Sequence, residues 1–336
     1  MQKSMEKYAR LIESGKINPL VRYDGKSSGV IFDPGKDDVP TDVLGFGIYQ
    51  LENGPFSEET GEREWVLVPQ DGDFRVEVED EVYEGAREGG PFACTPECCN
   101  AGAVYVPRES SFKVSGKGEM VFYTSTASKK REPAFVKPES RKYLGTGAAT
   151  WWRGVIVLVS PENYSCNLVI GETYSPPGLW SGTPLHVHDK DDASGGQSDH
   201  EEVYYHVSRL KEKERLGPYA VQLLMDGQRV MRAFVLTDKC AFAIPGGAHP
   251  VVAGPMSDMV YTWGLAGKEG PLGMWDLPEF KYLKKVGQIV EKLKEGRGTS
   301  KVGRSELEEL GAGELNEFQR KMLELILREQ GFEVTG

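Results

Sequence analysis

All five histidines of this 336-residue chain lie between positions 186 and 249. His186 and His188 are two residues apart, so on a β-strand both imidazoles project from the same face and can share one ion. Glu202 follows after a polar segment, and His249 comes directly after a turn that contains two glycines. Three imidazoles and one carboxylate suit Zn, Mn, Fe or Ni and leave coordination positions open for a substrate. The sequence therefore predicts that these four residues bind one divalent metal ion.

Two side chains near the expected ligands are candidates for moving a proton. A two-residue period places Tyr204 and His206 on the same strand face as Glu202. Each can serve as a general acid or base, or simply line the site, and Glu172 is a reserve carboxylate for the same catalytic role. His200 follows a loop rich in aspartate, where ordinary solvation explains a polar side chain better than ligation does.

The elements that must position these residues are short strands. Apolar runs recur about every eight to twelve positions over residues 43–127, with turn sequences between them. After a polar connection at 128–150, a second series of such runs extends over residues 154–265, interrupted by a predicted polar loop at 189–200. The 40 glycines and 20 prolines favour tight turns. The two series predict a duplicated, mainly β fold with two barrels.

The expected organisation has four parts along the chain. They are an N-terminal helical segment at 1–30, a first barrel without metal at 31–140, a metal-binding second barrel at 141–270 and a helical C-terminal extension at 271–336. Within the extension, residues 280–293 and 315–330 have apolar side chains at helical spacing. We assign the second apolar stripe to packing or to association between copies of the chain.

Composition excludes several classes of partner. The net charge of −11 includes no basic stripe, which argues against nucleic acid and against an anionic membrane surface. No run of 18 apolar residues is present, and the mixed-charge N-terminus lacks the apolar core of a secretion signal. The odd number of five cysteines is a poor disulfide framework. We therefore expect a cytoplasmic protein with reduced thiols, a small-molecule partner and a possible homo-oligomer.

The order of the expected ligands resembles the metal motif of the cupin superfamily, in which a histidine pair and a glutamate precede a further histidine. A closer resemblance is to the deoxyglucuronate isomerase family of inositol catabolism, which is similar to the ketodeoxyuronate isomerases of pectin breakdown. The residues that carry it are the runs 171–181, 184–189, 201–206 and 244–251, together with 61–64, 105–108 and 145–153 in the first half. The resemblance covers roughly residues 40–268.

This resemblance implies a bicupin fold and a metal-dependent aldose–ketose isomerase, with 5-deoxy-glucuronate converted to 5-dehydro-2-deoxy-gluconate. Such a reaction needs a Lewis acid at a carbonyl and a group that moves a proton between neighbouring carbons. The carboxylate of a sugar acid needs a cation or a polar donor, and Arg153, Gln222 and Lys190 are the candidates. Gln222 interrupts the apolar strand expected at 219–224, so its amide must find a partner or face a cavity.

Other functions remain open from the sequence. The same resemblance admits a ketodeoxyuronate isomerase. Three histidines and a carboxylate on a redox-active metal could also activate oxygen, as in a cupin oxygenase. A non-enzymatic cupin that binds a sugar or a metal is the third alternative.

Overall fold

The first series of apolar runs folds into a barrel of two facing sheets. The computed structural model describes residues 3–210, 217–295 and 299–335. The strands of this barrel are β2 (Gly29–Phe32), β3 (Gly45–Gln50), β4 (Phe56–Glu59), β5 (Arg63–Pro69), β6 (Gly72–Val78), β7 (Glu81–Arg87), β8 (Ala103–Val106), β9 (Ser111–Lys117), β10 (Glu119–Thr126) and β11 (Ala134–Val136). They form a six-stranded sheet, β11-β8-β5-β10-β3-β2, and a four-stranded sheet, β4-β9-β6-β7. Buried side chains such as Leu67, Val76 and Phe122 fill the space between these sheets.

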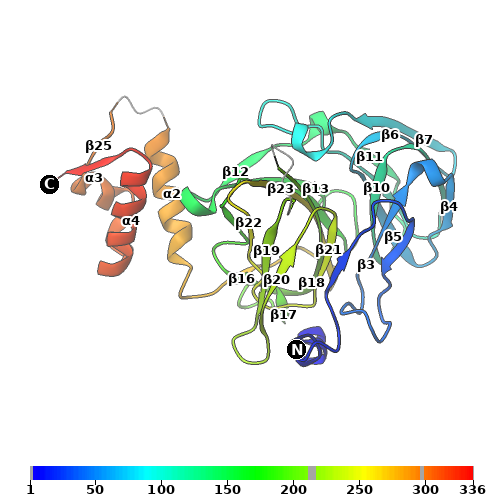
Figure 1. The fold of residues 1–336 in the computed structure, drawn as a ribbon, viewed down its shortest axis with the longest axis horizontal. Coiled ribbons are helices and arrows are strands. Elements are labelled where there is room, and N and C mark those ends of the chain that lie inside the picture. The colour runs from blue at the N-terminus through cyan, green and yellow to red at the C-terminus, as the bar shows by residue number, and fades with distance from the viewer. Residues whose placement is uncertain (1–2, 211–216, 296–298, 336) are drawn as a thin grey trace.

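The second series forms another two-sheet barrel beside the first (Figure 1). Its strands are β1 (Leu20–Arg22), β12 (Leu144–Thr146), β13 (Arg153–Val159), β14 (Val169–Ser175), β15 (Trp180–Ser181), β17 (Asp189–Asp192), β18 (Gln197–Leu210), β19 (Ala220–Met225), β20 (Met231–Leu236), β21 (Cys240–Ile244), β22 (Val251–Ala253) and β23 (Ser257–Gly267). The larger sheet runs β1-β21-β18-β23-β14-β13-β12 with β17 beside β18, and the smaller one runs β15-β22-β19-β20. Helix α1 (Lys3–Glu13) adds Met5 and Ile12 to the core of this barrel.

The large sheets of the two barrels pack against each other through alternate residues of their strands. On β18, Val203 and Tyr205 join the apolar core between the barrels, where the ring of Tyr205 lies 5.8 Å from that of Phe46. The Tyr205 hydroxyl donates to Glu119 of the first barrel at 2.6 Å. Because side chains alternate along a strand, the residues between them, including Tyr204, face the interior of the second barrel.

A buried ion pair also joins the two barrels. Arg87 of β7 donates two hydrogen bonds to the two carboxylate oxygens of Glu172 on β14, each at 2.6 Å. The side chains are 0% and 3% exposed. Glu172 thus neutralises a buried arginine between the barrels, and the structure does not bring it to the histidines. Its neighbour Thr173 faces the barrel interior instead, as the two-residue period requires, so this position does not favour the reserve catalytic role of Glu172, which stays a prediction.

The C-terminal extension is a small helical unit attached to the second barrel. It contains α2 (Tyr282–Lys294), β25 (Lys301–Gly303), α3 (Arg304–Glu309), α4 (Glu317–Glu329) and β26 (Glu333–Thr335), with β25 and β26 paired in parallel. Asn316 and Gln319 form a capping box at the start of α4. Apolar residues of α2, such as Ile289, pack with Leu327 of α4 and with Trp151 of the barrel. Figure 1 shows α2 between the barrel and the rest of the unit.

Short elements complete the chain. They are the two-stranded pair β16 (His186–Val187) and β24 (Trp275–Asp276) and the 3-10 helices η1 (Leu51–Asn53), η2 (Pro91–Ala93), η3 (Pro138–Ser140), η4 (Ala149–Trp151) and η5 (Ala312–Glu314). Two expectations are corrected by these assignments. The predicted polar loop at 189–200 is a hairpin of β17 and β18, and the predicted helical segment at 1–30 is helical only in α1, since β1 adds to the second barrel.

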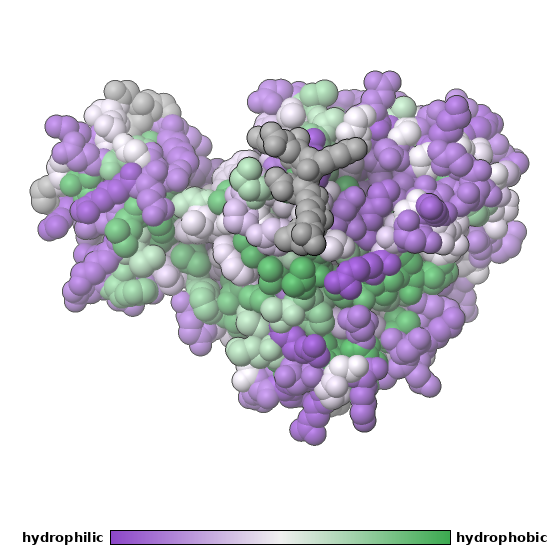
Figure 2. Space-filling view, in the orientation of Figure 1, coloured by the Kyte–Doolittle hydropathy of each residue, from purple (hydrophilic) through white to green (hydrophobic). Residues whose placement is uncertain are grey.

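The surface is mostly polar, with apolar side chains gathered in one region of the visible face. Figure 2 shows hydrophilic residues over both ends of the molecule and a band of apolar residues across its middle. Among the residues that the structure describes, no helix is long and apolar enough to span a membrane. A homo-oligomer stays a prediction.

The ion pair between the barrels generates the first testable prediction. Replacing Arg87 with Met leaves the Glu172 carboxylate buried without its partner, so we expect a loss of roughly 3–5 kcal/mol in the free energy of unfolding. Arg75, whose ion pairs with Glu77 and Glu84 are exposed, is the control, and Arg75→Met should change stability little. Urea denaturation measures both. Equal effects of the two substitutions would contradict the structural role of Arg87.

Candidate active site

A turn rich in glycine carries His249 into the second barrel. Gly246 and Gly247 have φ angles of +146° and +79°, which side chains other than glycine rarely adopt. A Cβ atom on Gly247 would meet the Met225 carbonyl oxygen at 2.8 Å. The Gly247 amide donates to Asp189 at 2.8 Å, so the strand after His188 holds this turn in place.

Three of the four expected ligands converge in the barrel interior. The Nε2 atoms of His188 and His249 lie 3.2 and 3.1 Å from the same Glu202 carboxylate oxygen. One ligand atom from each of these three residues lies within 4.8 Å of the others, and all three residues are buried. His186 stands at the edge of the group, with its ring centroid 5.5 Å from that of His249 and 6.3 Å from that of His188.

The backbone fixes the orientation of all three imidazoles in the same way. Each Nδ1 atom contacts a carbonyl oxygen, in the pairs His186 with Pro184 at 2.9 Å, His188 with His200 at 3.0 Å and His249 with Gly247 at 2.7 Å. A carbonyl only accepts hydrogen bonds, so each Nδ1 carries a proton and Nε2 is the ring atom that can bind a metal ion, although at His188 this atom contacts the Glu202 carboxylate. The buried Nε2 of His249 lies 3.1 Å from the Glu202 oxygen but makes no well-directed hydrogen bond to any described residue. This donor set fits a divalent metal ion.

Charge and burial set the protonation states that such an ion requires. Burial and the neighbouring His249 and His188 lower the pKa of His186 to about 3, so its ring is neutral at pH 7. Burial opposes ionisation of Glu202, but His188 and His249 outweigh it and lower its pKa to about 2. Burial would lower the pKa of His188, whereas the Glu202 carboxylate raises it, so a metal ion at His188 competes with a proton.

Tyr204 and His206 continue from Glu202 along the same face of β18. The Tyr204 ring centroid lies 5.9 Å from that of His249, 5.6 Å from that of His206 and 4.5 Å from that of Tyr261. Burial is the main cause that raises the pKa of Tyr204 well above its usual value, and the nearby Glu202 carboxylate raises it further. Burial lowers the pKa of His206 to about 3, and neither ring nitrogen has a hydrogen-bond partner among the described residues. Both groups are therefore uncharged at neutral pH.

Two residues have roles in the site that the sequence did not reveal. His200 is buried in β18 instead of solvated in a loop, and its carbonyl orients His188. Tyr261 of β23 packs on Tyr204 and His206, and its hydroxyl lies 2.5 Å from the Ser181 hydroxyl. The alternation of side chains along β23 could have predicted that Tyr261 faces the barrel interior. The sequence gives no sign that β23 pairs with β18, so it could not predict that Tyr261 lies beside Tyr204.

The three candidates for substrate binding have different positions. Arg153 is largely buried, donates to the Thr183 carbonyl at 2.8 Å, and forms no ion pair with a carboxylate of the described residues. Burial lowers its pKa. Lys190 points outward, and its ammonium group lies 3.5 Å from Asp192. Its neighbour Asp189 occupies the inward position, so the Lys190 side chain lies away from the histidine cluster.

Gln222 has a supporting position behind His249. Its side-chain amide donates to the carbonyl of His249 at 2.7 Å, and to those of Leu223 and Pro250 at 3.0 and 3.2 Å. The side-chain nitrogen of this fully buried residue therefore finds its partners in the backbone of the histidine turn, whereas its Oε1 has none among the described residues. These contacts position His249, and the expectation that Gln222 binds substrate stays a prediction.

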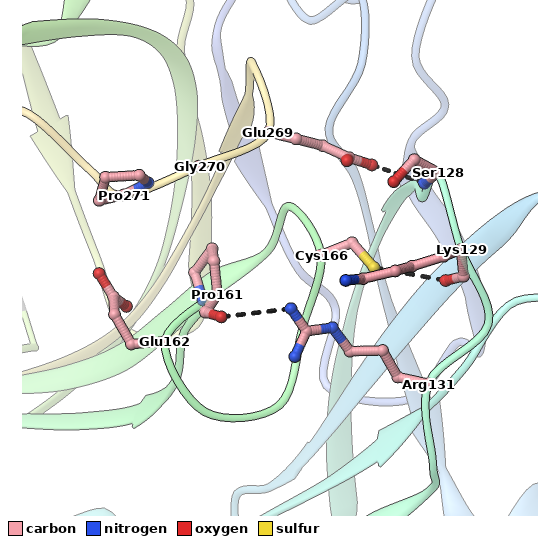
Figure 3. A pocket seen from close by; sticks show the side chains of 9 residues that line it. All are labelled: Ser128, Lys129, Arg131, Pro161, Glu162, Cys166, Glu269, Gly270 and Pro271. Atoms are coloured by element: carbon pink, nitrogen blue, oxygen red, sulfur yellow. Dashed lines mark hydrogen bonds between the residues drawn. The ribbon is translucent and has the colours of Figure 1, made fainter.

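A pocket of about 370 Å³ opens beside this cluster. Its barrel side includes Arg153, Thr183, Pro184 and His186, and helix α2 lines its other side. A separate pocket of about 430 Å³ includes Arg131, Glu162 and Cys166 (Figure 3). This second pocket contains no histidine and shares no residue with the first, so the candidate substrate site is the pocket beside His186.

Two β-barrels, with a histidine–glutamate cluster in the second, define a bicupin with one candidate metal centre. The sequence pattern of the KduI/IolB family matches residues 20–283, and the chain belongs to this family. The curated relatives are isomerases, and the chain is an enzyme of this class. These findings confirm the predicted bicupin fold and the resemblance seen in the sequence.

Individual relatives match most of the chain. A 5-deoxy-glucuronate isomerase from Geobacillus kaustophilus is 27% identical over 244 residues, which cover 71% of this chain and 84% of the relative. The enzyme of the same name from Bacillus subtilis (strain 168) is 24% identical over 236 residues, covering 68% and 82%. Among solved structures, an IolB-like protein from Salmonella typhimurium has a TM-score of 0.70 and 21% identity, covering 79% of this chain and 99% of its own. An oxalate decarboxylase from Bacillus subtilis shares the fold, with a TM-score of 0.52 and 11% identity over 78% of this chain and 80% of its own.

The position of Gln222 generates a prediction about metal affinity. Gln222→Leu keeps most of the side-chain volume but removes the donor that holds the His249 backbone, so we expect the affinity for a divalent metal to fall roughly 10- to 100-fold. Competition with a fluorescent chelator measures this affinity. Gln228→Leu, in the exposed turn between β19 and β20, is the matched control and should leave the affinity unchanged. An unchanged affinity in Gln222→Leu would reject the positioning role.

Proposed function

We propose that this isomerase is metal-dependent and interconverts an aldose and a ketose on a deoxy-uronate, with 5-deoxy-glucuronate as substrate and 5-dehydro-2-deoxy-gluconate as product in inositol catabolism. The observation that carries the proposal is the set of three imidazoles whose Nδ1 atoms are held by backbone carbonyls around Glu202, beside a pocket that contains Arg153, which has no carboxylate partner among the described residues. The curated relatives are named for the same substrate.

The four expected ligands define how the cofactor would be held. His186, His188, Glu202 and His249 would bind one divalent ion, of Zn, Mn, Fe or Ni, which supplies a Lewis acid to polarise the substrate carbonyl. The neutral His186 and the ionised Glu202 are already in the protonation states that ligation needs, whereas at His188 the ion would displace a proton. Burial of the cluster excludes water around the reacting carbons.

Arg153 supplies the contact that selects a sugar acid. Its guanidinium is largely buried, lines the pocket with His186 and has no carboxylate partner in the described part of the chain. A planar guanidinium binds a carboxylate through two parallel hydrogen bonds. We therefore assign Arg153 to the carboxylate of the substrate, with the carbonyl end toward His186.

Tyr204 and His206 are the groups that move protons in this proposal. The reaction transfers the carbon-bound proton of C2 to C1 and the O2 hydroxyl proton to O1, so no other reactant is needed. His206 is neutral and has an unpaired ring nitrogen that can accept a proton. The Tyr204 ring lies between His206 and His249, and its neutral phenol can pass a proton between the substrate and His206.

Several features of the proposal concern the whole protein. A sugar acid is the proposed small-molecule partner and the cytoplasm the proposed location, and the net charge of −11 argues against nucleic acid and anionic membrane partners. We also propose domain boundaries at residues 30, 140 and 270. The metal barrel would then hold the chemistry, and the first barrel, which has no histidine, would serve as its support.

Removal of metal tests the proposed function. We expect about one divalent ion per chain, loss of turnover of 5-deoxy-glucuronate after chelation, and recovery after metal is added back. NMR in D2O follows the reaction and should detect a deuteron on the carbon beside the new ketone. Turnover should proceed without oxygen, which an oxygenase would not allow. Bound metal without turnover of this sugar would reject the substrate, and full activity after chelation would reject metal dependence.

Loss of the phenol tests the proton-transfer role of Tyr204. Tyr204→Phe keeps the ring packing on Tyr261, so we expect normal metal content but a kcat lower by roughly 100-fold. The control is Tyr219→Phe, which removes an exposed hydroxyl and should keep kcat. If Tyr204→Phe turned over at the normal rate, Tyr204 would only line the site.

Arg153 gives a prediction about substrate selection. Arg153→Met removes the cation but retains apolar contact, so we expect KM for the deoxy-uronate to rise at least about tenfold, the effect of losing roughly 1.4 kcal/mol of binding. Metal content should stay the same. The methyl ester of the sugar, which lacks the negative charge, should show a much smaller difference between the two proteins. An equal effect on acid and ester would contradict carboxylate recognition.

A further inference from the structure

Helix α2 forms one wall of the pocket that contains His186 and Arg153. Its residues Leu283, Lys284, Gly287, Gln288 and Glu291 line this pocket. The family match ends at residue 283, so nearly all of this wall lies outside the part of the chain that is shared with the family. The substrate pocket of this chain therefore has a side that the family resemblance does not describe.

The orientation of α2 is fixed by packing on its other side. Val286, Ile289, Val290 and Leu293 are buried in the core that also contains Trp151 of the barrel. Lys284, Gln288 and Glu291 follow at spacings of four and three residues, so they lie along one face of the helix. This face is the one that lines the pocket, while the apolar face holds the helix against its neighbours.

Gly287 gives the pocket its width at this wall. A Cβ atom there would meet only Gly147, at 3.9 Å, which is ordinary van der Waals contact. Gly147 and Gly287 both line the pocket, so a longer side chain at position 287 would take up part of its space. Glycine is otherwise unfavourable inside a helix, by roughly 1 kcal/mol relative to alanine. Its place at the pocket is therefore explained better by space for a ligand than by helix stability.

The charges of the wall indicate what that ligand presents to it. Lys284 lies 3.6 Å from Asp276, so Arg153 remains as the cation for a carboxylate. Gln288 and Glu291 have no ion pair or side-chain hydrogen bond within the described ranges, and they offer both donors and acceptors. Sugar hydroxyls match such groups, whereas Glu291 would repel a second carboxylate.

We propose that α2 determines substrate specificity, with Gly287 providing space and with Gln288 and Glu291 binding the hydroxyls between the carbonyl and the carboxylate of a sugar monoacid. This inference rests on the proposed function, because it assigns the carbonyl end to the metal cluster and the acid end to Arg153. It adds the C-terminal extension to the active site. The ligand class is a polyhydroxylated chain with one carboxylate.

Substitution at Gly287 tests the wall directly. Gly287→Leu should raise KM for 5-deoxy-glucuronate at least about tenfold, with unchanged metal content and Tm, because leucine is a better helix former than glycine. Gly287→Ala is the matched control and should keep KM within about twofold, since its Cβ has room.

Gln288→Ala and Glu291→Ala should each raise KM roughly three- to tenfold, the effect of one lost hydrogen bond. Lys292→Ala, which is exposed and does not line the pocket, should leave it unchanged.

The outcomes separate this inference from the proposed function. Absence of turnover in the wild-type protein would reject the proposed function, and calorimetric binding of the sugar acid to wild type and Gly287→Leu would then still test the wall. Equal KM or binding in both proteins would overturn the role of α2. Loss of metal or of thermal stability in Gly287→Leu would overturn it as well, because the helix would then support the barrel instead of contacting substrate.

Discussion

The active site depends on three contacts between imidazole Nδ1 atoms and backbone carbonyls. The carbonyls of Pro184, His200 and Gly247 fix which nitrogen of each ring carries the proton. The Nε2 atoms of His188 and His249 are then directed at one oxygen of Glu202. An Nε2 lone pair next to an ionised carboxylate is unfavourable without a shared cation, so the backbone of the barrel holds these residues in the arrangement that the proposed metal ion requires.

The two-residue period of the strands separates structural from chemical roles. On β18, Tyr205 joins the core between the barrels, whereas Tyr204 and Glu202 face the cluster. On β14, Glu172 neutralises the buried Arg87 between the barrels. The first barrel therefore supports one face of the catalytic sheet and leaves the other face free for polar groups. The cost of burying those groups is offset by packing on the opposite side of the same strands.

The local pattern of apolar and polar residues was enough to predict much of the fold from the sequence. Runs with strong β pattern were located correctly, because β3 to β10 lie within the first predicted series at 43–127 and β19 to β22 lie within the second at 154–265. The hairpin at 189–200 was missed because its polar residues lack the apolar alternation that marks a strand. His188, Glu202 and His249 were predicted as a group because their types and spacing suit one ion, and the structure brings them together. The positions of Glu172, Lys190 and Gln222 could not be predicted, since each depends on partners or facing directions set by tertiary packing.

The central claim is that the backbone-anchored histidines present their Nε2 atoms, with Glu202, to a single metal ion. A crystal structure of the metal-loaded protein, with anomalous scattering recorded at the absorption edge of the bound metal, tests it most directly. The account predicts one anomalous peak, bound by Nε2 of His186, His188 and His249 and by a Glu202 oxygen, with open positions toward the pocket beside Arg153. A peak elsewhere, or ligation through Nδ1 with the carbonyl contacts broken, would contradict it.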